Sequence, residues 1–212
     1  MSLDAGRARG LARFLRLAAA LKELPRTGWL DRGVPAARAE SVAEHSFQTA
    51  LLAWTAASAD PSLNRDRLLR LALVHDLAEA LIGDWTPYDQ RDIPDRLADP
   101  AGWRAFLERR HHRSPERRAA KRAAEQAATA QLLALLGGNL RVEIAVLLRE
   151  LEEGQSAEAR FLKQVELLET WLQSRVYAAS DPGLPLASFA ADIDEAITHP
   201  ALVALRDAAR EG

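Results

Sequence analysis

Apolar residues recur along most of this chain at the three- and four-residue spacing of an α-helix, and the alternation that marks β-strands is nearly absent. Proline, glycine and polar capping residues interrupt this pattern at intervals that suit helices of about ten to twenty residues. We therefore predict an all-α fold, with helices over residues 10–24, 42–57, 66–83, 115–136, 140–152, 156–177, 188–197 and 201–210.

The length and composition fit one domain that spans residues 1–212 and is large enough to enclose a pocket. Residues 88–114 have poor periodicity and form a predicted irregular insertion, and residues 180–212 form the predicted C-terminal helices. The formal net charge of −2 gives no basic excess for a nucleic-acid partner. No apolar run approaches the roughly 20 residues of a membrane-spanning helix. We expect a soluble protein without nucleic-acid or membrane partners.

The chain contains no cysteine, so it can form neither a disulfide nor a thiolate metal site. Any bound metal must therefore be held by histidine and carboxylate side chains. The same composition suits a reducing cytoplasm, and we expect a cytoplasmic location.

Histidines and acids intrude on two apolar helical faces. Ser41 and Glu44 form a capping box that starts the second predicted helix, and His45 points inward from its first turns. In the third predicted helix, His75, Asp76 and Glu79 interrupt an apolar stripe, where unpaired charges are costly. For either histidine alone, a hydrogen-bonded core residue is the simpler interpretation. The combination of the two histidines with the carboxylates of Asp76 and Glu79 favours a metal site.

The order of these motifs resembles the HD-domain metal-dependent phosphohydrolases and, among them, the 5′-deoxynucleotidases. The similarity extends from the first helix to about Trp171 and is weak in the insertion and at the C-terminus. It is carried by the stretches Pro25-Arg26-Thr27-Gly28-Trp29, Glu40-Ser41-Val42-Ala43-Glu44-His45-Ser46, Leu71-Ala72-Leu73-Val74-His75-Asp76-Leu77-Ala78-Glu79 followed by Gly83-Asp84, and Ser156-Ala157-Glu158-Ala159-Arg160-Phe161-Leu162-Lys163-Gln164-Val165-Glu166.

By this resemblance, one divalent transition metal is held by His45, His75, Asp76 and the acid at position 166. Imidazole and carboxylate ligands suit Mn, Co, Zn, Ni or Fe, and the ligand set does not select among these ions. The family has aspartate at the matching position, whereas this chain has Glu166. Helical periodicity leaves Glu169 as an alternative ligand, and a site without either acid as a third possibility.

The resemblance also implies roles in substrate binding and catalysis. Glu79 would act as the acid–base residue, and Arg26 would hold the phosphate of a nucleotide substrate. Asp84 would recognise a sugar that lacks the 2′-hydroxyl, and Trp29 would line the pocket. The implied activity is removal of the 5′-phosphate from (deoxy)nucleoside 5′-monophosphates by a homodimeric enzyme.

The sequence is also compatible with two alternative functions. Related metal centres act on other nucleotides, such as deoxynucleoside triphosphates, cyclic nucleotides or alarmones, so the fold does not determine the substrate. The replacement of aspartate by Glu166 also permits a non-catalytic module that binds a nucleotide or a metal.

Overall fold

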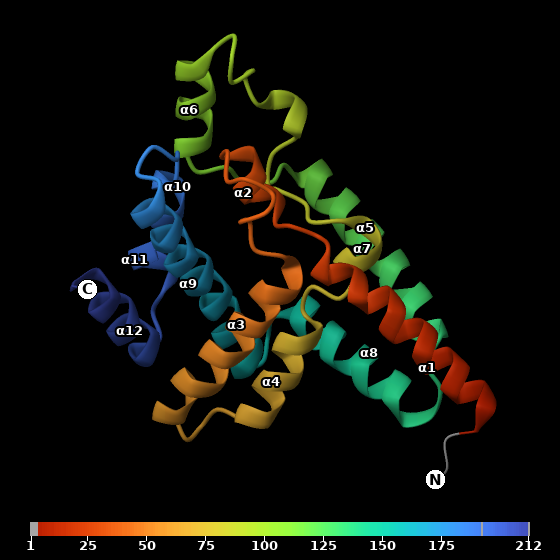
Figure 1. Ribbon diagram of the computed structural model, residues 1–212. Coiled ribbons are helices and arrows are strands. Elements are labelled where there is room, and N and C mark those ends of the chain that lie inside the picture. The colour runs from red at the N-terminus through yellow and green to blue at the C-terminus, as the bar shows by residue number, and fades with distance from the viewer. Residues whose placement is uncertain (1–3, 192, 212) are drawn as a thin grey trace.

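The computed structural model describes residues 4–191 and 193–211, and these form an assembly of α-helices (Figure 1). Within those residues the only β-type pairing is an isolated antiparallel bridge between Pro25 and Ser41. The all-α prediction is therefore confirmed. The helices are α1 (Ala5–Ala18), α2 (Thr27–Asp31), α3 (Val42–Ala56), α4 (Arg65–Val74), α5 (Glu79–Ile82), α6 (Pro100–Glu108), α7 (Pro115–Ala134), α8 (Gly138–Glu153), α9 (Ala157–Ser180), α10 (Ala187–Ala190), α11 (Ile193–Ala196) and α12 (Pro200–Glu211), with short 3-10 turns at Ala19–Lys22, Ala57–Ala59 and Gln90–Asp92.

Polar side chains cap the first turns of α3, α7 and α9, and the capping box of α3 is the predicted one. Ser41 accepts a hydrogen bond from the backbone N–H of Glu44, and the Glu44 carboxylate accepts one from the Ser41 N–H, which completes the capping box of α3. Ser114 and Ser156 cap α7 and α9 in the same way with their hydroxyl oxygens. The starts of the helices that carry the site are therefore set by local sequence.

The main core lies where α3, α4 and α9 pack together, with α8, α11 and α12 closing its sides. Its fully buried side chains include Ala53, Leu68, Leu71, Leu162 and Leu168. Close packing of this kind leaves little freedom for the helix axes. The core thereby fixes the positions of α3 and α9 relative to the C-terminal end of α4. The candidate site lies at this end of α4.

The predicted continuous helix over residues 66–83 is wrong, because the chain turns between α4 and α5. Within this turn the hydrogen bonds are of the tighter three-residue type, from Leu77 N to Val74 O at 3.1 Å and from Glu79 N to Asp76 O at 3.0 Å. The ring of His75 binds the Ala72 carbonyl at 2.7 Å, which a continuous helix would pair with the Asp76 N–H. His75 and Asp76 therefore lie at a helix end rather than along one face.

The predicted irregular insertion contains a helix, α6, and protrudes at the top of Figure 1. It has a small apolar cluster of its own, in which Tyr88, Trp103, Phe106 and Leu107 are buried. The predicted helix over 188–197 is divided into α10 and α11. None of the helices over residues 4–191 and 193–211 is long and apolar enough to cross a membrane.

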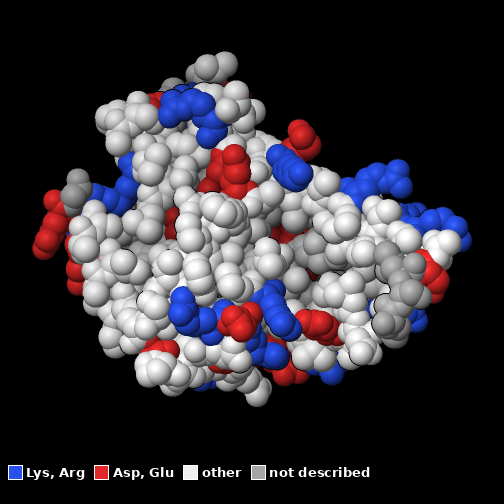
Figure 2. All heavy atoms as spheres, turned by 60° about the horizontal axis from the view of Figure 1, so that its bottom comes forward, with Lys and Arg blue, Asp and Glu red and all other residues white. Residues whose placement is uncertain are grey.

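Figure 2 shows acidic and basic side chains close together on one face of the molecule, with broad uncharged areas between them. Among the pairs on the surface are Arg70 with Glu143 at 2.6 Å and Arg122 with Glu152 at 2.6 Å. Mixed charges of this kind form no continuous basic strip on the face shown.

Candidate metal centre

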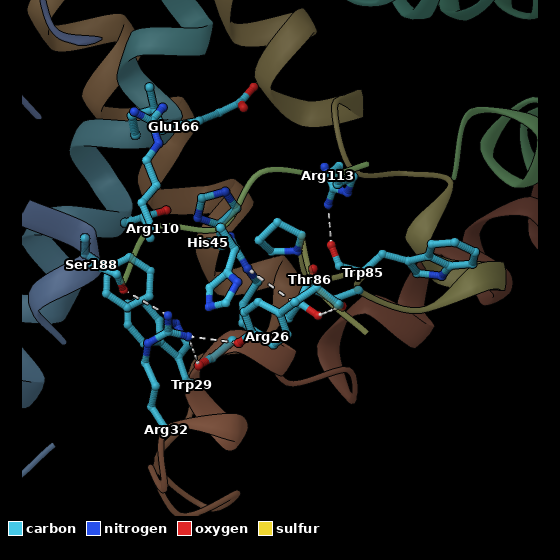
Figure 3. A pocket seen from close by; sticks show the side chains of 18 of the residues that line it. Arg26, Trp29, Arg32, His45, Trp85, Thr86, Arg110, Arg113, Glu166 and Ser188 are labelled. Carbon is cyan, nitrogen blue, oxygen red and sulfur yellow. Dashed lines mark hydrogen bonds and ion pairs between the residues drawn. The ribbon is translucent and has the colours of Figure 1, made fainter. Parts of the chain in front are cut away.

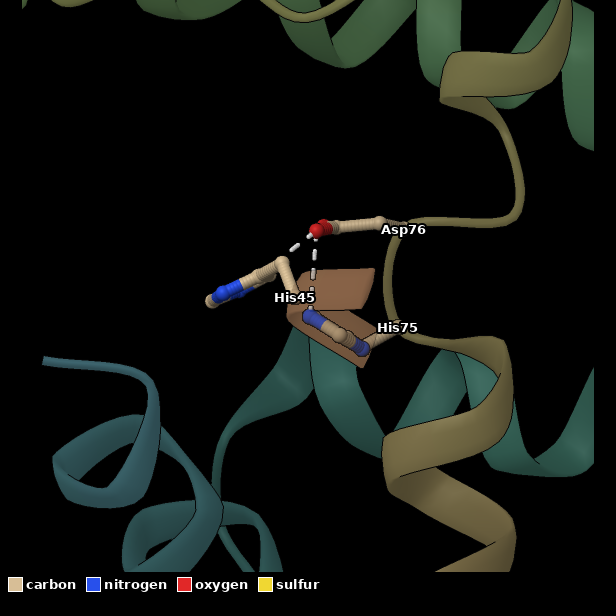
Figure 4. A group of neighbouring side chains, drawn as sticks. All are labelled: His45, His75 and Asp76. Atoms are coloured by element: carbon tan, nitrogen blue, oxygen red, sulfur yellow. Dashed lines mark ion pairs between the residues drawn. The ribbon is translucent and has the colours of Figure 1, made fainter. Parts of the chain in front are cut away.

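His45, His75 and Asp76 converge on one point, although His45 comes from α3 and the other two from the turn after α4 (Figure 4). Their candidate ligand atoms all lie within 4.8 Å of one another. The Oδ2 atom of Asp76 is 3.0 Å from Nε2 of His75 and 3.9 Å from Nε2 of His45. Two imidazole nitrogens and a carboxylate oxygen at this spacing form one side of a metal-binding site.

The hydrogen bonds of the two rings leave Nε2 of each histidine available to a metal. Nδ1 of His45 lies 2.6 Å from Oε2 of Glu169, and Nδ1 of His75 lies 2.7 Å from the Ala72 carbonyl oxygen. Carbonyl and carboxylate oxygens accept hydrogen bonds, so Nδ1 donates in both rings and Nε2 carries the lone pair of the neutral imidazole. The Nε2 atom of His75 is buried, and the polar atom beside it is Oδ2 of the neighbouring candidate ligand Asp76 at 3.0 Å. This donor set fits a divalent cation.

The two histidines differ in their affinity for protons. Burial, together with the positive charges of Arg26 and His75, lowers the pKa of His45 to about 3, so this ring is neutral at physiological pH. Burial also lowers the pKa of His75, but the adjacent Asp76 carboxylate outweighs this effect and raises it to about 9. A metal ion would therefore displace a proton from His75 when it binds.

Two further acids, Glu169 and Glu40, lie on the opposite side of the His45 ring from Asp76. These two residues are 4% and 8% exposed, and burial raises the pKa of each carboxyl group to about 7. Glu40 accepts a hydrogen bond from the Trp29 indole N–H at 2.7 Å. Glu169, which periodicity offered as a rival metal ligand, thus contacts the other ring nitrogen of His45. Sequence reasoning assigned no role to Glu40, whose only signal was its position before the capping box.

Glu166 lines a cavity that His45 and Asp76 also line, but its carboxylate does not join the group formed by His45, His75 and Asp76. Its carboxylate pairs with Lys163 at 3.0 Å, and it is not part of the group whose ligand atoms lie within 4.8 Å. In Figure 3 it lies above His45, on the side of the cavity away from Arg26. Its assignment as the fourth ligand stays a prediction.

Glu79 is buried at the start of α5, with its side chain 5% exposed. Its Oε1 atom lies 3.4 Å from Nζ of Lys121, while Oε2 is buried without a partner. Burial and the negative charges of Asp76 and Asp84 raise the pKa of Glu79 to about 8. A carboxyl group in this environment can both hold and release a proton near neutral pH.

Arg26 and Asp84 lie together, because short backbone contacts join distant segments. Arg26 N donates to Glu40 O at 2.9 Å, which places Arg26 beside the start of α3. Gly83 has φ 77°, a left-handed conformation that turns the chain out of α5 into Asp84. The Asp84 carboxylate accepts a hydrogen bond from the Thr27 N–H at 2.6 Å and lies 3.8 Å from the Arg26 guanidinium.

A cavity of about 400 Å³ connects these groups, and Arg26, His45, Asp76, Glu79, Asp84 and Glu166 line it. The Nη1 atom of Arg26 is buried beside it without a hydrogen-bond partner, so the guanidinium is ready for an anionic ligand. Trp29 also lines the cavity, but it is only 1% exposed and its N–H is bound to Glu40. The indole therefore presents little surface to a ligand.

Comparison with known proteins agrees with this geometry. A family model described as HD domain matches residues 18–197. The chain belongs to the HD domain family. The adjacent pair His75 and Asp76 therefore lies within the matched region of an HD domain, and the resemblance seen in the motifs is confirmed.

Within this family, the chain is similar to two mammalian proteins named 5′-deoxynucleotidase HDDC2. It is 38% identical to the Homo sapiens protein over 200 residues, which cover 93% of this chain and 83% of that protein. It is 37% identical to the Mus musculus protein over 204 residues, which cover 95% of this chain and 87% of that protein. The HD fold also resembles a conserved hypothetical protein from Pyrococcus furiosus, with a TM-score of 0.68, 23% identity, and coverage of 95% of this chain and 99% of that one.

Proposed function

We propose that this HD-domain protein is a metal-dependent phosphohydrolase that removes the 5′-phosphate from deoxynucleoside 5′-monophosphates. The observation that carries the proposal is the convergence of His45, His75 and Asp76 next to a cavity in which Arg26 has a buried, unpartnered N–H group. The similarity over most of the chain to proteins named 5′-deoxynucleotidase supports the choice of substrate.

His45 and His75 would hold the metal through their Nε2 atoms and Asp76 through its carboxylate, with Glu166 as the predicted fourth ligand. A bound divalent transition ion, such as Mn, Co, Zn, Ni or Fe, supplies positive charge that polarises a phosphoryl oxygen and lowers the pKa of bound water. Lys163 now pairs with Glu166, so the Glu166 side chain would leave this ion pair when it binds the metal.

Hydrolysis adds water across the bond between phosphorus and the 5′-oxygen. The attacking water loses one proton, and the leaving 5′-oxygen gains one. Glu79 can carry this proton on Oε2, which is buried and has no partner, while Lys121 holds Oε1. Arg26 supplies paired N–H donors for the non-bridging phosphate oxygens.

Asp84 would read the sugar from a position that its hydrogen bond to Thr27 holds in place. A carboxylate can accept a hydrogen bond from a 2′-hydroxyl, so Asp84 would favour deoxyribose by leaving no space for that hydroxyl. We infer from this arrangement that Asp84 sets the deoxy preference and that Arg26 sets affinity for the phosphate. The two residues lie 3.8 Å apart, so changes at either would affect the other.

We infer that the active form is a homodimer. The chain exposes 11898 Å², whereas a compact monomer of its mass exposes about 9,700 Å² by the size scaling of monomeric proteins. Phe47, Leu51 and Trp54 form an apolar stripe on α3 at helical spacing and are 66%, 43% and 41% exposed. A second copy on this stripe would cover it.

Phe47→Glu should then convert a dimer mass in solution to a monomer mass, and a wild-type monomer at micromolar concentration would contradict the inference.

The activity is tested by phosphate release from deoxynucleoside and ribonucleoside 5′-monophosphates, deoxynucleoside triphosphates and cyclic nucleotides. Metal-stripped protein is resupplied separately with Mn, Co, Zn, Ni and Mg. Activity on 5′-monophosphates, stronger for deoxy sugars and lost in Asp76→Ala, supports the proposal. Activity confined to other nucleotides contradicts it. Metal binding without turnover across the panel would favour a binding module, a function that the pairing of Glu166 with Lys163 also fits.

A further inference from the structure

Lys121 of α7 contacts two acids near the metal centre. Its Nζ atom donates to Oε1 of Glu79 at 3.4 Å and lies 3.1 Å from Oε1 of Glu125. The Lys121 side chain is only 17% exposed, and it lines the cavity that Glu79 and Asp76 also line. The other oxygen of Glu79, Oε2, is buried and has no hydrogen-bond partner. The contact with Lys121 therefore distinguishes the two oxygens of one carboxylate.

The placement of Lys121 follows from the inner face of α7. Lys121 lies on the same helical stripe as Ala128 and Leu132, which are both buried. This stripe faces the rest of the molecule, and α7 packs beside α5, which begins with Glu79. The packing of two helices thus brings the Lys121 ammonium group to the Glu79 carboxylate.

An ordinary ion pair on the surface of a helix does not explain these contacts. Lysine four residues before glutamate is the less stabilising order for such a pair, because it runs against the helix dipole. Lys121 and Glu125 have this order. The second partner of Lys121, Glu79, is buried and belongs to another helix. The pair with Glu125 therefore holds Lys121 against Glu79 more than it stabilises α7.

The lysine at this position stands out in a chain that uses arginine almost everywhere. Only three of the 28 Lys and Arg residues are lysine. Two of the three, Lys121 and Lys163, line the cavity and pair with Glu79 and Glu166. An arginine fork binds both oxygens of a carboxylate, whereas a lysine ammonium has a single nitrogen that can contact one of them. Lysine therefore leaves Oε2 of Glu79 free where arginine would occupy it.

We propose that Lys121 is a positioning residue, held by Glu125, that binds Oε1 of Glu79 through one N–H and keeps Oε2 free to carry the transferred proton. The proposal rests on the phosphohydrolase function and the acid–base role of Glu79 inferred above. The reaction is unchanged: the attacking water loses a proton, and Oε2 carries it to the 5′-oxygen as the bond from that oxygen to phosphorus breaks. Lys121 keeps its own protons and acts only through Glu79.

Steady-state kinetics with a deoxynucleoside 5′-monophosphate and Mn²⁺ test the role of Lys121. Lys121→Met should lower kcat about tenfold or more, as part of the roughly 10²–10⁴-fold that acid–base catalysis contributes, and leave KM within about threefold. Lys121→Arg keeps the charge but presents a fork, so it should not restore kcat. Glu125→Gln should lower kcat by only about threefold, because Lys121 then loses one partly exposed ion pair.

Arg122→Met is the matched control, because Arg122 is the next residue of α7 and pairs with the surface acid Glu152 at 2.6 Å. It should keep the wild-type kcat and KM. An unchanged kcat in Lys121→Met would overturn the proposal. Full activity in Lys121→Arg would also overturn it, because charge alone would then suffice. The same holds for a raised KM with an unchanged kcat in Lys121→Met, since Lys121 would then bind the nucleotide.

Because the chain contains no cysteine, the ammonium group can be restored chemically at this one position. Lys121→Cys introduces a single thiol, and alkylation with 2-bromoethylamine extends it to a side chain that ends in an ammonium group. Mass spectrometry follows the modification, and thermal unfolding shows that the protein is folded. Aminoethylation should return kcat to within about threefold of the wild type, whereas iodoacetamide, which adds a neutral amide, should not. Equal kcat after both reagents would overturn the proposal.

The contacts of Lys121 can also be measured without turnover. Acylation of metal-stripped protein with acetic anhydride, resolved by mass spectrometry, should modify Lys121 more slowly than the exposed Lys22. In Glu125→Gln, Lys121 should react about threefold faster than in the wild type, the effect of one partly exposed ion pair. An unchanged rate would overturn the proposal even if the enzyme is active. A wild type without activity on any 5′-nucleotide would instead reject the proposed function and the role of Lys121 in it, while the acylation rates would still report on the contact.

Discussion

The Nδ1 atom of His45 lies 2.6 Å from Oε2 of Glu169, a residue 124 positions away in the sequence. Glu169 therefore sets which nitrogen of His45 carries the proton and turns Nε2 toward Asp76. Glu40, held by Trp29, completes a buried acidic pair behind the ring. Carboxylates that hold the far nitrogen of a metal-binding histidine orient the ring and strengthen it as a ligand.

Replacing Glu169 by Gln should weaken metal binding by about 10–100-fold, because the amide holds the His45 ring less firmly in the required tautomer. Calorimetric titration of metal-stripped protein with Mn²⁺ or Co²⁺ measures this effect. Glu143→Gln is the control, since Glu143 is a surface acid on α8 that pairs with Arg70. Equal metal affinity in wild type and Glu169→Gln would show that Glu169 does not orient the ligand.

Replacing Glu166 tests whether it is the fourth ligand. If it is, Glu166→Ala should lower metal occupancy, and Glu166→Asp should preserve or increase it, because aspartate keeps the carboxylate with one methylene less. Metal content after dialysis against a fixed concentration of Mn²⁺ distinguishes these variants. Lys163→Met controls for loss of the ion pair with Glu166. Unchanged occupancy in Glu166→Ala would remove Glu166 from the ligand set.

Asp84→Ala should abolish the preference for deoxy over ribo 5′-monophosphates, since it removes the carboxylate that is proposed to read the sugar. Asp84→Asn keeps an oxygen that can accept the Thr27 N–H, so it separates the loss of charge from disruption of the Thr27 contact. The ratio of kcat/KM for the two sugars is the measurement. A deoxy preference that survives in Asp84→Ala would assign sugar recognition to another residue.

The metal-free protein should lose stability as the pH rises from about 6.5 to about 9. Glu40, Glu169 and Glu79 have pKa values raised to about 7, 7 and 8, and that of His75 is raised to about 9. Each of these groups is more protonated in the folded than in the unfolded state over part of this range. The folded state therefore binds more protons, and its stability falls as those protons are lost.

His45 does not cancel this trend. Its pKa is lowered to about 3, so its contribution rises with pH only up to about its unfolded value near 6.5. Urea unfolding of metal-stripped protein at several pH values gives the free energy of unfolding. Glu40→Gln should show a smaller decrease, because it removes one of the titrating groups. A free energy that increases between pH of about 7 and 9 would contradict the prediction.

Local sequence was sufficient for much of the helical architecture. The Ser41 and Glu44 capping box starts α3 in the predicted place, and α7 and α9 begin within one residue of their predicted starts. These predictions succeed because a cap and a helical repeat involve residues within about four positions of one another. The same local patterns carried the resemblance to the HD family through the motifs around His45 and His75.

Tertiary structure alone decided how the chemical groups meet. Periodicity carried the helix of α4 through His75 and Asp76, whereas the chain turns there and aims both side chains at α3. It also made Glu169 an alternative ligand, whereas the packing of α9 against α3 puts its carboxylate on the far nitrogen of His45. Which atom of a ring faces a distant carboxylate depends on the distance and rotation between two packed helices, and this information lies in no local stretch of the chain.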